Sequence, residues 1–357
     1  MPDFTALVVR LSSLGDVILT TPIFENLKAA GPRGRTSVLV KRAYAPVFEN
    51  NPFVDEVLIF EEKGLWGWVR EIRRRRFDVV LDLHDTPRSR IWGWLSGAGR
   101  LVRYDKRAGA RRRLVRTKVM SSRLAGRVVD RYLETLGELV FPVRARQPKI
   151  FVRDGDLDAG LVRRLGSGPF IGVAPGAVHA AKRWPTERFA EAADSLLMAP
   201  SPLGRSHAAL LASAVGRGSP EGRGEGKVLI LGSRTDRAVA EAVRGSLKSP
   251  SINLAGETSL RELFSLLSRC RVVLTNDSGI MHAADALDVP TAAVFGPTVE
   301  AFGFFPAGPR SNIVQVEGLA CRPCHIHGPE SCPLGHFKCM KDVTAAGVVA
   351  AAQQVLS

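Results

Sequence analysis

The segment Arg271-Val-Val-Leu-Thr-Asn-Asp-Ser-Gly-Ile-Met-His282 decides the fold class of this chain. Its apolar run predicts a buried strand, and the polar residues after it predict a tight turn into a helix. A second apolar strand, Val289-Pro-Thr-Ala-Ala-Val-Phe-Gly-Pro297, follows an alanine-rich stretch. Strand, helix and strand in succession indicate a parallel α/β sheet, in which ligands bind beyond the carboxyl ends of the strands.

The turn itself carries the polar groups that would hold a ligand, namely Asp277, Ser278, Gly279 and His282. The N–H groups that begin a helix have no partner within it and attract anions. We therefore expect these residues to bind a phosphorylated ligand. His282 could equally be a hydrogen-bonded histidine on a helix face.

Two further apolar strands end in polar loops. Residues 170–174 lead into Pro175-Gly176 and then Lys182-Arg-Trp-Pro185, where the proline marks a helix start. Residues 6–11 lead into Ser12-Ser-Leu-Gly-Asp16 before a helix over 16–30. Three loops at strand ends thus carry side chains suited to chemistry.

Alternating patterns extend through both halves of the chain. Residues 1–150 predict strands at 6–11, 36–41, 56–60 and 77–83, and helices at 16–30, 66–76, 88–97 and 126–139. Residues 170–295 predict strands at 170–174, 227–232, 251–254, 271–275 and 291–295, with helices between them. A last helix is expected at 343–356, and residues 142–156, rich in Pro, Arg and Gly, are the expected linker.

A length of 357 residues suggests two domains. We expect domains at 1–150 and 151–342, followed by a C-terminal helix at 343–357. Residues 199–226, rich in Ser, Gly, Pro and Arg, predict a mobile insertion, because loops of this length are uncommon in compact domains. No apolar run reaches the roughly 18 residues of a spanning helix, and no secretory signal opens the chain, so we expect a cytoplasmic protein.

Positive charge is concentrated in the first half. Residues 1–150 hold 29 Lys and Arg against 16 Asp and Glu, which supplies +13 of the net charge of +15. Such a field attracts polyanions. Nucleic acid is not expected, since neither stacking aromatic groups nor a groove-reading motif accompanies the basic residues. An anionic membrane or an acidic substrate fits better, and an arginine-rich composition without a partner stays open.

The motifs together resemble the ADP-heptose:lipopolysaccharide heptosyltransferases of glycosyltransferase family 9. The shared features are the Ser12–Asp16 loop, Pro175-Gly176 with Lys182–Pro185, Asn276–Gly279 with His282, Gly296-Pro297-Thr298, and the tail Cys321-Arg-Pro-Cys324 … Cys332-Pro-Leu-Gly-His-Phe-Lys-Cys339. The resemblance implies a fold of the GT-B type, with two facing Rossmann-like domains and a C-terminal helix that crosses back to the first domain.

The resemblance also implies a function. The donor would be ADP-heptose, and the acceptor the core–lipid A part of lipopolysaccharide at the anionic inner leaflet of the cytoplasmic membrane, where the enzyme would be peripheral. The tail is most like that of the second-heptose enzymes. The family's reaction inverts the anomeric centre in one displacement, and neither a cofactor nor a catalytic metal is expected.

Within that function each motif receives a role. Asp16 in the first domain resembles the family's general base, although by position alone it could simply cap the helix that it opens. Lys182 would hold the departing diphosphate, unless it is a solvated loop lysine. Thr258, Ser259 and Leu260 match the family segment that meets the adenine. Candidate contacts to the acceptor are Ser12, Ser13, Gly15 and Arg88.

Four of the five cysteines, Cys321, Cys324, Cys332 and Cys339, have a spacing that would permit a structural zinc ion. Reduced thiols without a metal are the alternative, because disulfides are disfavoured in the cytoplasm.

Another class of function remains possible, a non-catalytic protein of this fold that binds nucleotide sugars or anionic glycans. Such a protein has no use for a base at Asp16, so that residue distinguishes the two hypotheses. A nucleotide-sugar epimerase of similar architecture would not explain the Ser12–Asp16 loop.

Overall fold

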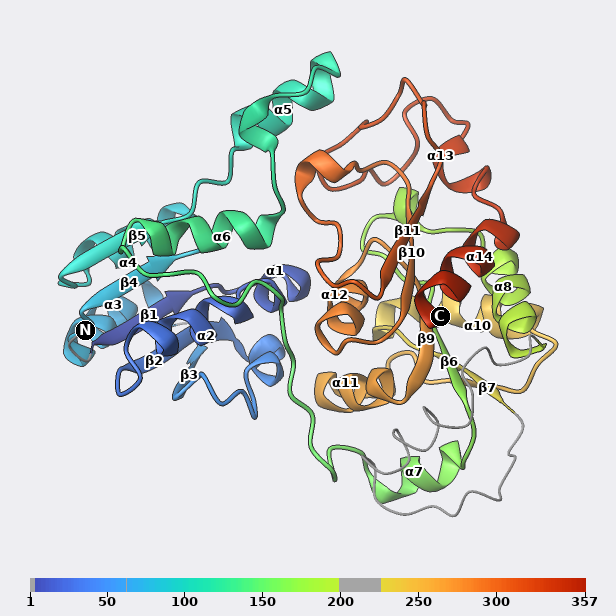
Figure 1. Ribbon diagram of the computed structural model, residues 1–357, viewed down its shortest axis with the longest axis horizontal. Coiled ribbons are helices and arrows are strands. Elements are labelled where there is room, and N and C mark those ends of the chain that lie inside the picture. The colour runs from blue at the N-terminus through green and yellow to red at the C-terminus, as the bar shows by residue number, and fades with distance from the viewer. Residues whose placement is uncertain (1–3, 62, 199–225) are drawn as a thin grey trace. The chain divides into compact units, whose positions relative to one another are not determined.

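The computed structural model describes residues 4–61, 63–198 and 226–357 (Figure 1). The chain divides into two compact units. Unit 1 comprises Met1–Leu114, Val119–Phe151 and Glu300–Ala307, and unit 2 comprises Val115–Lys118, Val152–Val299 and Gly308–Ser357. The main division between the units falls after Phe151. Two short segments are exceptions, because Val115–Lys118 belongs to unit 2 and Glu300–Ala307 belongs to unit 1.

The described part of unit 1 contains a five-stranded sheet in the order β3-β2-β1-β4-β5, with every pair parallel. Its strands are β1 (Thr5–Val9), β2 (Arg35–Lys41), β3 (Glu56–Phe60), β4 (Val79–Asp82) and β5 (Arg100–Arg103). Its helices are α1 (Leu14–Ile18), α2 (Thr21–Ala30), α3 (Gly64–Arg75), α4 (Pro87–Leu95), α5 (Ala108–Thr117), which extends into unit 2, and α6 (Val128–Gly137). The inner strands are apolar along their length because helices cover both faces of a parallel sheet.

The helix expected over residues 16–30 is two helices. α1 ends at Ile18, and α2 begins at Thr21 with Pro22 in its first turn. Proline has no backbone N–H to donate and is tolerated only where a helix starts, so Pro22 separates the two. The short α1 leaves Asp16 close to the end of β1.

The described part of unit 2 contains a six-stranded parallel sheet in the order β11-β10-β9-β6-β7-β8. Its strands are β6 (Phe170–Ala174), β7 (Lys227–Ile230), β8 (Ser251–Asn253), β9 (Cys270–Asn276), β10 (Thr291–Phe295) and β11 (Ser311–Gln315). Its other helices are α7 (Ala159–Leu165), α8 (Thr186–Met198), α10 (Arg237–Ser246), α11 (Leu260–Ser268), α12 (Gly279–Ala286), α13 (Lys338–Lys341) and α14 (Ala345–Leu356).

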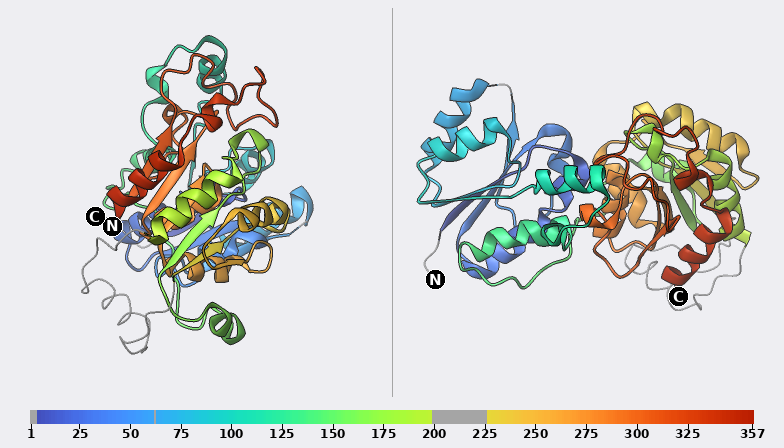
Figure 2. Two further views of the ribbon diagram at one scale, coloured as in Figure 1. Left: turned by 90° about the vertical axis from the view of Figure 1, so that its right-hand side faces the viewer. Right: turned by 90° about the horizontal axis from the view of Figure 1, so that it is seen from above.

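The C-terminal helix, which was expected to cross back to the first domain, belongs to unit 2. α14 packs against α8 and against β10 and β11, all within unit 2 (Figure 2). Its buried residues Val348, Ala352 and Leu356 join the core around β6 and β9, which explains why it stays there. The segment that returns to unit 1 is Glu300–Ala307, where Gly303 accepts a backbone hydrogen bond from Val128 at 2.8 Å.

The insertion predicted at residues 199–226 lies outside the described residues except for Gly226. Within the described ranges, no helix has both the length and the apolar character needed to cross a bilayer.

Candidate functional site

Each sheet has one point at which the chain changes direction. In unit 1 the chain runs from β1 outward to β3 and then returns to the other side of β1 as β4. In unit 2 the corresponding neighbours are β6 and β9. Ligands of open α/β sheets bind beyond the carboxyl ends of the strands at this switch point. The loops after β1 and β4, and those after β6 and β9, are therefore the candidate sites.

Asp16 stands at the switch point of unit 1, in the first turn of α1. Its Oδ2 lies 2.8 Å from Nη2 of Arg10 and accepts a hydrogen bond from the Ser13 hydroxyl at 2.8 Å. Its Oδ1 accepts from the Tyr132 hydroxyl at 3.2 Å. The N-cap of α1 is Ser13 rather than Asp16. The carboxylate is thus held in one orientation, yet its side chain is 19% exposed and can be reached by a substrate.

Arg10 joins the two loops of this site. Its Nη1 donates to the carbonyl of Leu83, just after β4, at 2.6 Å, and its Nε donates to the carbonyl of Ser12 at 2.9 Å. Burial opposes its charge, but the Asp16 carboxylate, by its charge and its hydrogen bond, helps to raise the pKa of Arg10 above its ordinary value. Arg10 is therefore a permanent cation within the site.

His84 and Lys106 add to the electrostatics around Arg10. Burial, followed by the positive charges of Arg10 and Lys106, lowers the pKa of His84 to about 4, so its ring is neutral at pH 7. Burial and Arg10 also lower the pKa of Lys106, whose Nζ donates to the carbonyl of Asp85 at 2.8 Å. Both shifts are caused first by burial and then by the positive charges nearby, so the loops after β4 and β5 disfavour additional positive charge.

Tyr132 reaches Asp16 from α6, more than a hundred residues further along the chain. Tyr132 is fully buried, which raises its pKa well above the ordinary value, so it remains a protonated donor. Its ring packs edge-on against Tyr104 with centroids 4.7 Å apart. Arg131, also buried, fixes α6 by donating to the carbonyls of Gly126 at 2.8 Å and Phe302 at 3.1 Å.

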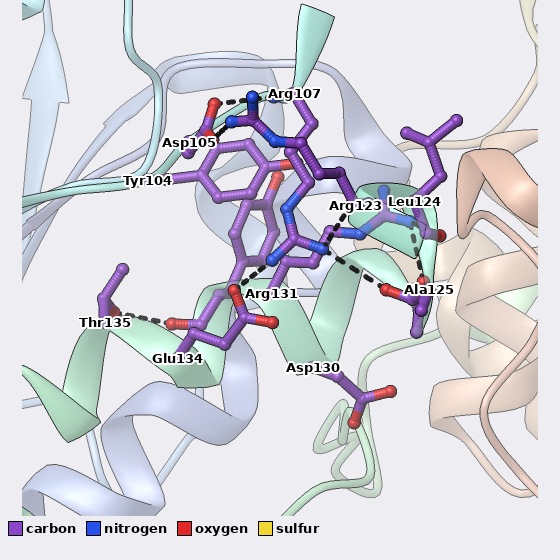
Figure 3. A network of polar contacts seen from close by, with 12 residues as sticks. Tyr104, Asp105, Arg107, Arg123, Leu124, Ala125, Asp130, Arg131, Glu134 and Thr135 are labelled. Atoms are coloured by element: carbon purple, nitrogen blue, oxygen red, sulfur yellow. Dashed lines mark hydrogen bonds and ion pairs between the residues drawn. The ribbon is translucent and has the colours of Figure 1, made fainter. Parts of the chain in front are cut away.

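Some of the basic residues in 100–127 hold α6 in place and are therefore not available to bind a ligand. Figure 3 shows Arg107 between Glu134 of α6 and the carbonyl groups of Arg123 and Ala125. Arg111 is buried, with its guanidinium 5.3 Å from the Phe304 ring centroid. By contrast, Arg112 and Arg116 of α5 are exposed. The charge excess of unit 1 thus has a structural and a surface component.

The other residues predicted to contact an acceptor lie in the loop after β1 and in α4, which follows β4. Ser13 is exposed and bonded to Asp16, Ser12 is half-buried and offers its carbonyl to Arg10, and Gly15 is buried in α1. Arg88 stands exposed in the first turn of α4, after β4, with its guanidinium 5.9 Å from the Phe60 ring centroid.

Lys182 and Asp277 meet at the switch point of unit 2. Lys182 Nζ lies 2.6 Å from Asp277 Oδ2, and the two side chains are only 14% and 8% exposed. The Thr298 hydroxyl donates to the same carboxylate oxygen at 2.7 Å. The structure therefore brings together two of the predicted donor residues from the loops after β6 and β9.

Asn276 ties these two loops to each other. Its Nδ2 donates to the carbonyl of Pro175 at 2.8 Å, and its Oδ1 accepts from the backbone N–H of Trp184 at 3.1 Å. The Trp184 indole is buried and donates to the carbonyl of Val343 at 3.1 Å. Lys182 is therefore held in place through Pro175, which precedes it in the chain, and Trp184, which follows it.

The helix start beside this pair is suited to an anion. Ser278 is the N-cap of α12 in an extended conformation and makes no side-chain cap hydrogen bond, while its hydroxyl lies 3.3 Å from that of Thr275. Because Ser278 does not occupy them, the N–H groups from Gly279 onward can donate to a phosphate. His282 is 5% exposed, one turn into α12.

The cysteine-bearing tail packs over the lysine loop. A Cβ on Gly328 would lie 2.9 Å from Cε of Lys182, so this glycine rests directly on the lysine side chain. Ala181 donates its N–H to the carbonyl of Pro329 at 3.3 Å. His179 Nδ1 lies 2.8 Å from Glu330 Oε1 and lowers the pKa of that carboxyl group.

The four cysteines of the tail influence one another electrostatically. Burial and the neighbouring thiols raise the pKa of Cys339 to about 11 and also raise that of Cys324. Across the described part of the chain, no three His, Cys, Asp or Glu side chains are placed to hold one metal ion. The side chains as arranged do not fit a tetrahedral zinc site, and the zinc hypothesis depends on sequence spacing alone.

Thr258, Ser259 and Leu260 mark the start of α11, after β8. Ser259 is its N-cap and shares a capping box with Glu262, whose N–H it accepts at 3.2 Å. This segment lies beyond the carboxyl end of the same sheet as Lys182, two strands from β6. Its described side-chain contacts are local ones.

Sequence reasoning missed Arg10, Tyr132, His84 and Lys106, and assigned no role to Asn276 or Thr298. Arg10 gave one usable signal, a charged residue that ends an otherwise apolar strand. Tyr132 gave none, because its contact with Asp16 depends on how α6 packs.

Two parallel α/β sheets, with a carboxylate at one switch point and a lysine beside a helix start at the other, are the features expected of a two-domain α/β glycosyltransferase. The sequence pattern of "Glycosyltransferase family 9 (heptosyltransferase)" matches residues 66–199 and 222–331, which is 244 of the 357 residues. The chain belongs to glycosyltransferase family 9.

Individual relatives agree with that assignment. Lipopolysaccharide heptosyltransferase 2 of Salmonella typhimurium is 26% identical over 319 residues, covering 82% of each chain. Lipopolysaccharide heptosyltransferase 1 of Pseudomonas aeruginosa is 27% identical over 346 residues, covering 89% of this chain and 85% of its own. The crystal structure of a family 9 glycosyltransferase from Veillonella parvula has the same fold, with a TM-score of 0.76 at 22% identity over 100% of this chain and 98% of that one.

Proposed function

We propose that the protein transfers heptose from ADP-heptose to the inner core of lipopolysaccharide, as the second heptose. Family membership supports heptosyl transfer. The Lys182–Asp277 pair beside the start of α12 carries the proposal, because it offers a cation and free N–H groups at the switch point of a Rossmann-like sheet. The second-heptose role is favoured by the cysteine-bearing tail and by similarity to a relative named heptosyltransferase 2.

The proposed reaction is one inverting displacement. Asp16 takes the proton of the acceptor hydroxyl, and the oxygen of that hydroxyl forms a bond to the anomeric carbon of the heptose. The bond from that carbon to the diphosphate oxygen breaks on the opposite face, and ADP leaves with the electron pair. General-base assistance of this kind contributes about 10²–10⁴ to the rate.

The leaving group receives its stabilisation from unit 2. As negative charge grows on the diphosphate, Lys182 and the N–H groups of α12 hold it, with charge-assisted hydrogen bonds worth about 1.5–3 kcal/mol each. Asp277, which neutralises Lys182 without ligand, would turn to the sugar hydroxyl groups. Thr258, Ser259 and Leu260 would meet the adenine, and His282 would lie near the phosphates. No step in this scheme requires a metal ion.

The proposed location follows from the acceptor. The glycolipid is assembled at the inner face of the cytoplasmic membrane, so the enzyme would be cytoplasmic and peripheral to that surface. For the cysteine tail, a structural zinc ion remains a proposal from spacing, and metal analysis showing far less than one zinc per chain would remove it.

The test is transfer by the purified protein. ADP-heptose is incubated with core acceptors that carry no heptose or one heptose, and products are identified by mass spectrometry and by the NMR signature of the anomeric configuration. We expect one heptosyl unit, inverted, on the one-heptose acceptor only, at a rate that EDTA leaves unchanged. Transfer to the acceptor without heptose would contradict the second-heptose role, and no transfer at all would contradict the function.

A further inference from the structure

Four tryptophans stand on two neighbouring helices of unit 1, and they form an inner and an outer pair. Trp68 of α3 and Trp92 of α4 are 2% and 0% exposed, and their indole N–H groups donate to the carbonyls of Glu61 at 2.8 Å and Leu65 at 3.2 Å. Trp66 of α3 and Trp94 of α4 are 70% and 79% exposed. The two helices contact each other along their length (Figure 2). The inner pair fixes the helices, and the outer pair has no such role.

The outer pair shares its surface with arginines. On α3, Trp66, Arg70 and Arg73 follow one another at intervals of four and three residues, which places them on one side of the helix. On α4, the exposed residues Arg90, Ile91 and Trp94 share a side in the same way. We call these six residues the tryptophan face.

Among the described residues, part of the charge on the tryptophan face has no ion-pair partner. Arg74 and Arg75 both pair with Glu71, and Arg90 pairs with Asp85 at 2.7 Å. Within the described ranges, no carboxylate lies within ion-pair distance of Arg70 or Arg73. Exposed indoles beside unpaired guanidinium groups indicate a partner that offers both apolar matter and negative charge.

An anionic lipid bilayer meets both requirements. Tryptophan is favoured at the boundary between headgroups and acyl chains, because its ring is apolar and its N–H is polar. Basic side chains near an anionic leaflet gain about a fivefold preference each, equivalent to about 1 kcal/mol. A second copy of this chain fits less well, because a symmetric contact would set Arg70 and Arg73 against their own counterparts.

We propose that the tryptophan face docks the protein on an anionic bilayer, with Trp66 and Trp94 at headgroup level and Arg70 and Arg73 on lipid phosphates. This deepens the proposed function, whose acceptor is a glycolipid, and rests on it for its biological meaning. The face is made of α3 and α4 and includes neither Asp16 nor the loops of unit 2.

The test measures sedimentation of the full-length protein with vesicles of phosphatidylglycerol and phosphatidylcholine, and with vesicles of phosphatidylcholine alone. One variant, Arg70→Gln with Arg73→Gln, removes charge. A second, Trp66→Ser with Trp94→Ser, removes the indoles. Arg144→Gln with Arg153→Gln is the matched charge control, since both arginines are exposed elsewhere. Val119→Ser with Met120→Ser is the apolar control, since these side chains are 57% and 54% exposed.

We expect the parent to bind the anionic vesicles and not the neutral ones. The double arginine variant should bind about 30-fold more weakly, the double tryptophan variant at least tenfold more weakly, and both controls like the parent. Unchanged binding in either face variant, or equal binding to neutral vesicles, would overturn the proposal. So would a parent dimer in light scattering that the tryptophan variant converts to a monomer.

ADP release with a deacylated, water-soluble acceptor separates this proposal from the proposed function. All four variants should turn over that acceptor at the parent rate, because none touches the proposed sites. Turnover without vesicle binding refutes docking and leaves the transferase intact. Vesicle binding that depends on the tryptophan face, without any turnover, supports docking and refutes the transferase.

Discussion

The two candidate sites occupy the same place in their sheets and are built differently. In unit 2, the ion pair of Lys182 and Asp277 and the brace of Asn276 come from two loops whose sequence motifs contain every participant. In unit 1, Asp16 depends on Tyr132 of α6, whose ring packs against Tyr104, and α6 itself is fixed by the hydrogen bond from Arg131 to the carbonyl of Phe302. The binding loops of unit 2 are determined by their own short sequence motifs. The orientation of Asp16 depends instead on how distant elements of unit 1 pack together.

If Asp16 is the base, its replacement should have the largest effect. Asp16→Asn keeps the shape of the side chain and removes its ability to accept a proton. We expect turnover to fall by about 10²–10⁴, measured as ADP release under saturating substrates. Transfer at the parent rate would show that Asp16 is only a structural residue of α1.

Lys182→Met should have the next largest effect, and it should act on binding. Losing one charge-assisted bond costs about 1.5–3 kcal/mol, which corresponds to roughly 10- to 150-fold weaker binding of ADP in calorimetry. The variant also leaves the Asp277 carboxylate buried beside Thr298 without its cation, so stability should fall.

A paired variant separates the two consequences. Lys182→Met with Asp277→Asn removes the uncompensated charge, so thermal stability should return toward that of the parent while ADP binding stays weak. Recovery of both would mean that Lys182 serves the fold rather than the ligand.

Tyr132→Phe should lower kcat by about tenfold and leave the KM for ADP-heptose unchanged, because it deletes one hydrogen bond to the Asp16 carboxylate without changing core volume. Tyr104→Phe is the matched control, since the Tyr104 hydroxyl contacts Arg111 at 3.3 Å instead. Equal effects of the two variants on kcat would indicate general damage to packing around α6.

Gly328→Ala should raise the KM for the donor by a few-fold at unchanged kcat. Its φ of +94° disfavours other residues, and the new Cβ would press on the Lys182 side chain. Gly318→Ala is the control, because Gly318 also has a positive φ, of +71°, but a Cβ there meets nothing within 4 Å. Steady-state kinetics that change alike in both variants would assign the effect to backbone strain.

The smallest effect is expected from His84→Gln on acid stability. Because the folded-state pKa of His84, about 4, lies below the ordinary 6.5, the unfolded chain binds that proton more readily. Its contribution to stability is complete above pH 6.5 and is lost as the pH falls toward 4. Urea unfolding should show that the parent loses more stability between pH 7 and pH 5 than the variant does, by on the order of 1 kcal/mol after solvent screening. Equal losses would contradict the shifted pKa.

Features with a local sequence signature could be predicted from the sequence. The parallel sheets and the binding turn after β9 were predictable, since apolar runs, Gly and Pro mark them locally. Four elements could not be predicted, because their sequences are short or rich in Arg and carry no clear apolar period. They are β5, α5, α7 and β11. The helix over 16–30 was wrong because Pro22 was not weighed as a helix start.

Long-range contacts set the remaining limit. That α14 packs on α8 follows from a core shared by distant strands, and that Tyr132 meets Asp16 follows from how α6 is anchored. Neither has a local signature. For the same reason, the sequence shows how many basic residues lie in 100–127 but not which of them are buried, such as Arg111, and which are exposed, such as Arg116.

The central claim, that unit 2 binds the nucleotide while Asp16 performs chemistry, is tested most directly by titrating ADP into Asp16→Asn and Lys182→Met side by side in a calorimeter. We predict parent-like affinity for Asp16→Asn and at least tenfold weaker binding for Lys182→Met. Weak binding by Asp16→Asn together with parent-like binding by Lys182→Met would contradict the division of roles.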